Sequence, residues 1–282
     1  MSDVDKNAEM PLLEHLRELR GRVIKSCIAL TIGFVVCLTF SNDIIDLLAA
    51  PIRQVLSGEE PTGRMDILYA TLTSPLESVP GWTMMTEGEA SGRLTIRGSL
   101  EGIYTYLRVG FLGGALLASP VVLFQIWRFV GPGLYKTEQS VVLPLTFFST
   151  LLFFMGAAFA YLIILPIAFR FFVTVVNAEA LLSIDDALKT VIRIIAAFGI
   201  CYQLPVVVWF FARIGLIDHK DMIRGFRYAV VAIFALSAII TPPDIITQVL
   251  LGIPLIILYG VGVIVAYFFS RKVRGEEFIE EI

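Results

Sequence analysis

Two carboxylates stand where the chain approaches an apolar run, and both could bind a cation. Glu18 lies in PLLEHLRELRGRVIKS (Pro11–Ser26), just before the first long apolar run. Glu138 lies in FQIWRFVGPGLYKTEQS (Phe124–Ser140), just before a later one. A carboxylate can accept two parallel hydrogen bonds from a guanidinium group, each stronger than a bond between neutral groups. These residues therefore allow a site for a cationic partner at a membrane surface.

Both acids also have structural explanations. Apolar side chains recur at helical spacing before the first apolar run, at Leu12, Leu16, Leu19 and Val23. This pattern predicts an amphipathic helix over residues 1–22. On that helix Glu18 and Arg22 could pair, for about 0.2–0.5 kcal/mol, and Glu138 could interact with the start of the helix that follows it. A solvated helix with internal ion pairs, and an acid at a helix start beside an aromatic belt, remain alternatives to a cation site.

Two further polar side chains lie in or beside apolar runs. Gln203, in AFGICYQLPVVVWF, is an amide near the middle of a run and is followed by Pro205. A buried amide needs hydrogen-bond partners. Gln203 could form a hydrogen bond that holds helices together, or it could have a functional role; the sequence leaves both alternatives open. In TPPDIITQ (Thr241–Gln248), Asp244 follows two prolines and is placed to cap the next helix.

Composition fixes the broad class. The 282 residues are 57% hydrophobic and 17% charged, with a mean hydropathy of +0.81. Several runs approach the roughly 20 apolar residues that cross a bilayer as a helix. We therefore expect an all-α polytopic membrane protein, a single integral membrane domain with six transmembrane helices. The expected spans are Val23–Phe40, Ile103–Ile126, Val141–Pro166, Val191–Phe211, Tyr228–Ile240 and Ile245–Phe269; the fifth is the shortest.

The distribution of Lys and Arg predicts the orientation of the chain. Cations gather in the N-terminal segment, the second-to-third loop, the fourth-to-fifth loop and the tail, residues 270–282. Six spans place these four regions on one side, and an excess of Lys and Arg marks the cytoplasmic side. Both termini are therefore expected in the cytoplasm.

Residues 41–102 form an extended first loop on the opposite, periplasmic side. Repeated Pro and Gly predict turns and short elements there. NDIIDLLAAPIRQVL (residues 42–56) predicts an amphipathic helix that is interrupted or bent at Pro51. GWTMMTEGEASGRLTIRG (residues 81–98) suggests a hairpin.

No motif for covalent chemistry is visible, so we do not expect an enzyme. The sequence has no phosphate-binding glycine loop, nucleophile elbow or HExxH motif, and its three cysteines lie in apolar runs without metal-site spacing. No metal and no cofactor are therefore predicted. The spans also lack the ionisable chain expected of a proton-coupled carrier. A secondary transporter for a small solute, with a site around Gln203, is kept as the alternative function. An intramembrane enzyme is the least favoured.

Four segments in order resemble motifs of the TatC family, the receptor subunit of the twin-arginine protein translocase. They are HLRELRGR, FQIWRFVGPGLYKTEQ, FGICYQLPV and ITPPDIITQVLLGIPLIILYG. The resemblance covers nearly the whole chain except much of the first outer loop. It implies a protein of the bacterial cytoplasmic (inner) membrane that binds the paired arginines of signal peptides on folded precursors. Export would be driven by the proton-motive force with TatA and TatB subunits, in a complex where we expect a homo-oligomer and no nucleic acid.

The resemblance also assigns residues. Signal-peptide binding falls to Glu18, Arg20, Phe129 and Glu138. Structural or translocation-related roles fall to Leu19, Arg22, Pro51, Gln203, Asp244 and Gln248. One departure matters, because many family members carry a glutamate where this chain has Gln203. An amide keeps the hydrogen-bonding capacity but cannot ionise, so no mechanism that needs a charge there applies.

Overall fold

The computed structural model describes most of the apolar part of the chain. The backbone is described for residues 4–57, 94–95, 99–130, 142–169, 182–240 and 245–280. Side-chain surroundings are described for 16–53, 100–130, 142–169, 185–240 and 248–269. Glu138 and Asp244, to which the sequence assigned roles, lie outside the described residues.

Six helical segments are long and apolar enough to cross a membrane, which confirms the predicted fold class. They are Leu16–Thr39, Leu100–Val130, Val142–Phe169, Asp185–Arg213, His219–Ile240 and Gln248–Phe269. The protein is therefore a multi-pass helical membrane protein.

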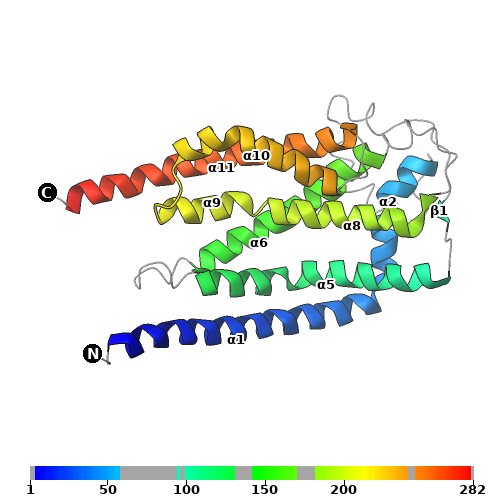
Figure 1. Cartoon of the computed structure of the whole chain (residues 1–282). Helices are drawn as coiled ribbons and strands as arrows, with labels where there is room; N and C mark the ends of the chain where they lie inside the picture. Colours follow the sequence, from blue (N-terminus) through cyan, green and yellow to red (C-terminus); the bar gives the residue numbers. More distant parts are fainter. Residues whose placement is uncertain are drawn as a thin grey trace.

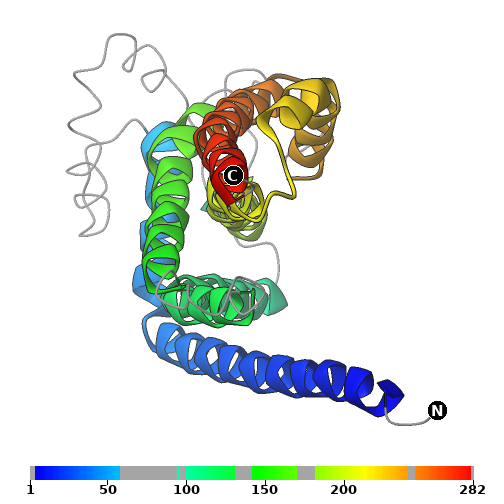
Figure 2. The same cartoon turned by 90° about the vertical axis from the view of Figure 1, so that its left-hand side faces the viewer.

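The helices of the described chain, which include α2 in addition to those that carry the spans, have the following bounds. They are α1 (Val4–Thr39), α2 (Ser41–Ser57), α5 (Ser99–Val130), α6 (Val142–Phe159), the π-helical η3 (Ala160–Ile164), α8 (Ile184–Cys201), α9 (Leu204–Arg213), α10 (His219–Ile240) and α11 (Ile245–Glu280). The helices run roughly along a common direction, with both ends of the chain at one end of the molecule (Figure 1). Seen from that end, they follow a bent line rather than a closed ring, with α1 outermost beside α5 (Figure 2).

The fourth predicted span is two helices rather than one. α8 ends at Cys201 and α9 begins at Leu204, with Gln203 at the break. Pro205 lies in the first turn of α9, where its missing N–H costs nothing. In a continuous helix the same proline would leave the carbonyl of Cys201 without its donor. The sequence placed Gln203 and Pro205 correctly but did not predict the break.

One other boundary differs from the sequence prediction. The fifth span belongs to a longer helix, because α10 begins at His219 and includes charged residues before Tyr228. These charges end the apolar run but not the helix. The helix predicted over residues 42–56 is present as α2, and it continues without interruption through Pro51, which lies fully buried inside it.

The main core forms around α8. Val191, Ile194 and Phe198 are almost completely buried on one face of α8, at the spacing of a helical stripe. They belong to one apolar cluster with residues of α2, α5 and η3, including Ile52 and Ile164. Sequence spacing within α8 thus predicts its buried face, and the neighbouring helices supply the rest of the core.

α1 packs against α5 through glycines. A β-carbon added to Gly114 would lie 2.5 Å from the backbone nitrogen of Phe34, and one added to Gly33 would lie 2.7 Å from the carbonyl oxygen of Gly114. Real β-carbons do not approach other atoms so closely. Small residues that let two backbones come together are a common basis of helix packing in membranes.

Two short strands pair the segment between α2 and α5 with the segment directly before α8, at the end of the molecule opposite the termini. β1 (Leu94–Thr95) pairs in parallel with β2 (Leu182–Ser183). The hairpin expected over residues 81–98 is described only at β1, and the partner of β1 is this distant segment. Sequence-local reasoning could not identify a partner so far along the chain.

We predict that Gly114→Ala lowers the stability of the α1–α5 pair. The added methyl group must push two backbones apart, and such overpacking costs about 1–3 kcal/mol. Thermal unfolding of the purified protein in detergent measures the effect. Gly102→Ala, on the same helix with no atom within 4 Å of the added carbon, is the matched control and should be neutral or slightly stabilising. Equal melting temperatures for the two variants would contradict the close contact.

Candidate functional site

Glu18 and Arg22 form the ion pair that their spacing predicts. Arg22 Nε donates to Glu18 Oε1 at 3.2 Å, and Arg22 Nη2 contacts the same oxygen. The Arg22 side chain is 13% exposed and that of Glu18 is 39% exposed. Arg22 thus contacts the carboxylate, and the Glu18 side chain remains partly exposed at the surface. A pair one turn apart on a single helix contributes about 0.2–0.5 kcal/mol to stability.

The packing of α1 on α5 places Glu18 level with Phe129. The two helices run antiparallel, and Gly33 meets Gly114 (Figure 1). Fifteen residues back from Gly33 is Glu18, and fifteen residues forward from Gly114 is Phe129. Because both helices rise by about 1.5 Å per residue, the two positions have the same height along the pair. The structure therefore brings two predicted binding positions to one end of two adjacent helices.

The other assigned residues near Glu18 differ in how far their side chains are exposed. Arg20 is exposed on α1, whereas Leu19 is half-buried. Phe129 is half-buried in the last turn of α5. Beside it, Arg128 lies over the ring of Phe124, 5.8 Å from the ring centroid. The neighbouring ends of α1 and α5 thus combine the Glu18 carboxylate with aromatic and cationic side chains.

Gln203 is part of a polar contact between helices. Its Nε2 donates to the backbone oxygen of Ser149 on α6 at 2.9 Å. The hydroxyl of Ser149 accepts a bond of 2.7 Å from Trp127 Nε1 on α5. Ser149 therefore links α5, α6 and the α8–α9 break, and the interhelical bond that the sequence offered for Gln203 is observed.

The same region holds two polar atoms that lack partners among the described residues. Gln203 Oε1 and Thr150 Oγ1 are both buried and neither makes a hydrogen bond there. An unsatisfied buried oxygen costs roughly 1–3 kcal/mol. Gln203 thus makes one favourable hydrogen bond and buries one oxygen without a bond. Its net contribution to stability is therefore smaller than the hydrogen bond alone suggests.

A charged cluster that the sequence analysis missed joins α5 to α8 at the opposite end. Asp185 accepts hydrogen bonds from Thr105 Oγ1 at 3.0 Å and from Arg108 Nη1 at 2.5 Å. Its other oxygen lies 2.5 Å from Lys189 Nζ, and Lys189 also contacts Asp186. Asp185 is buried. The available signal was an acid at the start of a span with Lys189 one helical turn later.

The other assigned residues are far from Glu18. Pro51 is buried in α2, and Gln248 is near the start of α11; α2 and the start of α11 both lie at the end away from the termini (Figure 1). Gln248 Nε2 donates to the backbone oxygen of Phe234 at 2.8 Å, which ties α11 to α10. The structure therefore does not gather the assigned residues into one site.

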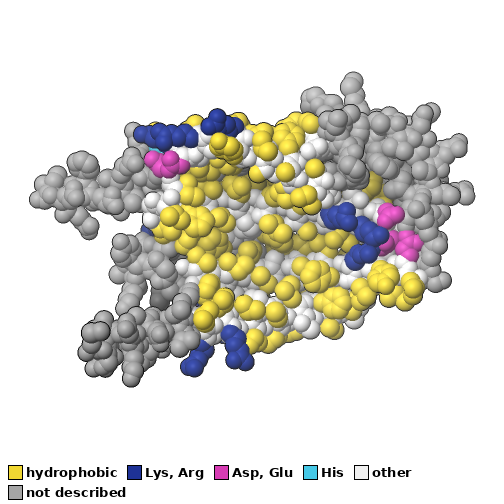
Figure 3. All heavy atoms as spheres, viewed as in Figure 1, with side chains coloured by type: hydrophobic (Ala, Val, Ile, Leu, Met, Phe, Trp, Pro, Cys, Tyr) yellow, Lys and Arg dark blue, Asp and Glu magenta, His cyan; other side chains and the backbone are white. Residues whose placement is uncertain are grey.

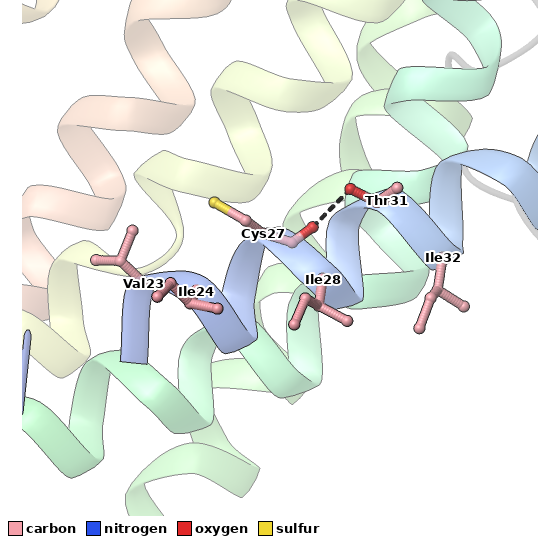
Figure 4. Close-up of a pocket in the computed structure, with 6 residues that line it drawn as sticks. All are labelled: Val23, Ile24, Cys27, Ile28, Thr31 and Ile32. Carbon is pink, nitrogen blue, oxygen red and sulfur yellow. Dashed lines mark hydrogen bonds between the residues drawn. The ribbon is translucent and has the colours of Figure 1, made fainter. Parts of the chain in front are cut away.

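A shallow apolar hollow lies along one face of α1. It is lined by Val23, Ile24, Cys27, Ile28, Thr31 and Ile32 (Figure 4). The hydroxyl of Thr31 donates to the backbone oxygen of Cys27 at 2.9 Å, so it is already satisfied. All six residues belong to one helix and are exposed, which is the surface expected of a span that faces lipid.

A family profile described as "Sec-independent protein translocase protein (TatC)" matches residues 14–254. The chain belongs to the TatC family. The TatC protein of Magnetococcus marinus is 34% identical to it over 281 residues, covering 99% of this chain and 92% of the relative. The Escherichia coli TatC protein is 32% identical over 269 residues, covering 95% and 92%. The resemblance found in the sequence is thus confirmed.

Solved structures agree. A crystal structure of the twin-arginine translocase receptor TatC aligns with a TM-score of 0.70 at 34% identity, covering 89% of this chain and 97% of that chain. A second structure of that receptor, in the detergent DDM, gives 0.71 at 32% identity, covering 89% and 99%. As a TatC family member, the chain is a component of the Sec-independent, twin-arginine protein translocase.

We predict that Asp185→Asn destabilises this TatC family member. Asparagine keeps the size of the side chain but leaves Arg108 and Lys189 without their charged partner. Because the acid is buried and both cations are partly exposed, the cost should be about 1–3 kcal/mol, between the values for exposed and buried pairs. Asp186→Asn changes the adjacent, exposed acid and should cost less than about 0.5 kcal/mol. If thermal unfolding ranks the two variants the other way, the cluster does not stabilise the fold.

We also predict that Gln203→Leu lowers stability by roughly 1 kcal/mol, through loss of the bond to Ser149, while precursor capture persists. Thr150→Val removes a neighbouring hydroxyl that makes no hydrogen bond among the described residues, so it should be neutral or stabilising. Thermal unfolding and a precursor pull-down measure the two effects. Unchanged stability of Gln203→Leu together with lost transport would show that helix packing is not the role of Gln203.

Proposed function

We propose that this chain is the core receptor of the twin-arginine translocase, binding the paired arginines of signal peptides on folded precursors. The observation that carries the proposal is an accessible Glu18 carboxylate held by Arg22 and level with Phe129. The membership of the TatC family and the similarity to crystal structures of the twin-arginine translocase receptor support it.

The proposed recognition rests on the shape of the guanidinium group. An arriving arginine shares the Glu18 carboxylate with Arg22 or displaces Arg22 from it. Glu138 would supply the second carboxylate, so that two acids meet two arginines. Phe129 and Arg20 would line the approach. Arginine forms a planar fork of donors, whereas lysine is a point charge, so exchange of arginine for lysine in the peptide should lose bonds.

The proposed placement in the cell follows from charge. Both termini lie at one end of the molecule (Figure 1), as an even number of spans requires. The Lys and Arg residues of that end favour the cytoplasmic side. We therefore place the protein in the bacterial inner membrane with both termini inside. The extended loop, residues 41–102, is then periplasmic, and residues 270–282 form a cytoplasmic tail.

The proposed partners are TatA and TatB, further copies of this chain in the receptor complex, and precursors exported by the proton-motive force. The family is a protein translocase component, and we assign the chain no catalytic reaction. The alternative of a small-solute transporter centred on Gln203 has no support, because the chain belongs to a family of protein translocase components.

Site-specific photo-crosslinking tests the receptor proposal. A photoreactive residue at Arg17, exposed beside Glu18, should form an adduct with a twin-arginine precursor. A twin-lysine precursor should give at least about tenfold less adduct, because each lost hydrogen bond to a charged group is worth roughly 1.5–3 kcal/mol.

Charge-removing variants complete this test. Glu18→Gln with Glu138→Gln should abolish the adduct, whereas Glu14→Gln, which removes a carboxylate one turn earlier on α1, should keep it. Capture that survives the double variant, with the protein still folded, would refute these acids as the receptor site.

A further inference from the structure

The backbone carbonyl of Leu47 in α2 has lost its regular hydrogen-bond donor. In an α-helix each backbone N–H donates to the carbonyl four residues earlier, and the residue four positions after Leu47 is Pro51. Proline has no N–H, and its ring also crowds the carbonyl of that earlier residue. The amide at position 51 therefore cannot bond the Leu47 carbonyl, although α2 continues through Pro51 to Ser57.

Tyr161 supplies a donor to this carbonyl from a distant segment. Its phenolic hydroxyl donates to the backbone oxygen of Leu47 at 2.5 Å, although the two residues are 114 positions apart in the sequence. Both residues are half-buried, and a carbonyl removed from water without a donor costs free energy. The hydroxyl thus gives the carbonyl the hydrogen bond that the amide at position 51 cannot.

The backbone that carries Tyr161 is itself irregular. Tyr161 lies in η3, the π-helical turn that continues α6, where the N–H of Leu165 donates to the oxygen of Ala160 five residues earlier. One residue more than an α-helical turn rotates the helix beyond it by about 100° relative to the helix before it. Single π turns of this kind are frequent at functional sites, and this one contacts α2 through Tyr161.

α2 needs a specific contact because it does not run with the spans. It crosses their direction at the end of the molecule away from the termini (Figure 1 and Figure 2). On the face drawn in Figure 3, hydrophobic side chains cover the middle and charged side chains gather toward the ends, so this end borders the apolar band. Leu48 and Ile52 of α2 share an apolar cluster with Ile164 of η3. Apolar contacts are not directional, whereas a hydrogen bond can fix the position of α2 on η3.

We propose that Tyr161 is the residue that positions α2: its hydroxyl replaces the helical bond that Pro51 removes, and this bond docks α2 on η3. Loss of the hydroxyl would leave the Leu47 carbonyl with neither the amide donor nor the phenolic one. A tyrosine that only filled space could be replaced by phenylalanine, which keeps the ring. The two roles therefore differ in the effect of removing one oxygen atom, and in whether that effect depends on residue 51.

A double-mutant cycle on the full chain tests the proposal, with unfolding by SDS in mixed detergent micelles as the measurement. Tyr161→Phe should raise the unfolding equilibrium constant about tenfold, because it leaves a half-buried carbonyl without a donor. In the Pro51→Ala background the alanine N–H can donate to the same carbonyl, so Tyr161→Phe should raise the constant less than about threefold there. Equal effects in the two backgrounds would overturn the proposal, whatever Pro51→Ala does alone.

Tyr259→Phe is the matched control. The Tyr259 hydroxyl also donates to a helix carbonyl, the backbone oxygen of Met222 in α10, at 2.9 Å. That carbonyl keeps its regular donor, because the residue four positions later is Phe226 and not proline. Tyr259→Phe should therefore raise the unfolding constant less than about threefold, and by the same factor with and without Pro51→Ala. A loss as large as that of Tyr161→Phe would overturn the special role of the carbonyl before Pro51.

Hydrogen exchange of the folded Tyr161→Phe protein locates the effect. The amides of α2 should exchange about tenfold faster than in the wild type, whereas those of α10 and α11 should be unchanged, because only the docking of α2 is weakened. Faster exchange throughout the chain would show a general loss of stability. Unchanged exchange in α2 would show that docking does not need the hydroxyl, and either result would overturn the proposal.

A functional measurement rests on the proposed receptor function. Glu18 and α2 lie toward opposite ends of the molecule, and α2 is on the periplasmic side in the proposed orientation, where cargo leaves. Tyr161→Phe should therefore capture a twin-arginine precursor within about twofold of the wild type while exporting it severalfold more slowly. Unchanged export, or capture lost together with export, would overturn the positioning role. A wild type that captures no precursor would instead refute the receptor proposal and would leave the double-mutant cycle unaffected.

Discussion

The contact between the backbones of Gly33 and Gly114 decides where the N-terminal part of α1 lies. Much of the rest of α1 is exposed apolar surface. Between helices in lipid there is no hydrophobic driving force, so close packing has to supply the attraction and the register. A slip of one helical turn would shift α1 by about 5.4 Å and would move Glu18 away from the level of Phe129. The geometry proposed for signal-peptide recognition therefore depends on two residues without side chains, far from the site along both helices.

Polar contacts fix the remaining helices at a few defined points. Asp185 ties α5 to α8 at one end, Ser149 joins three elements in the middle, and Gln248 ties α11 to α10. Where water is absent, a polar group without a partner costs free energy. Each such bond therefore favours one arrangement of its two helices over arrangements in which the bond is broken. The break at Gln203 is another such point, because the side-chain amide of Gln203 donates to a backbone oxygen of α6. The bent row of helices is thus held by the apolar core around α8 together with these localised polar contacts.

Patterns within a single segment were readable from the sequence, whereas pairings between segments were not. Hydropathy predicted six spans, and the spacing of Glu18 and Arg22 predicted their pair. The break before Pro205 was missed because a proline inside an apolar run is compatible with both a kinked helix and two helices. Asp185 was missed because its partner Arg108 lies on another helix, and the pairing of β1 with β2 joins segments that no local rule connects. The level of Phe129 with Glu18 likewise required the register of two helices.

The charges around Glu18 determine how the proposed receptor could recognise a cation. Arg17, Arg20 and Lys25 are exposed close to Glu18 along α1, so the field beyond this segment is positive and opposes an arriving pair of arginines. That repulsion is screened within roughly 8–10 Å at physiological salt, whereas a bidentate bond to a carboxylate acts at contact. Recognition would therefore come from hydrogen-bond geometry and not from long-range attraction, which suits a receptor that must distinguish arginine from lysine.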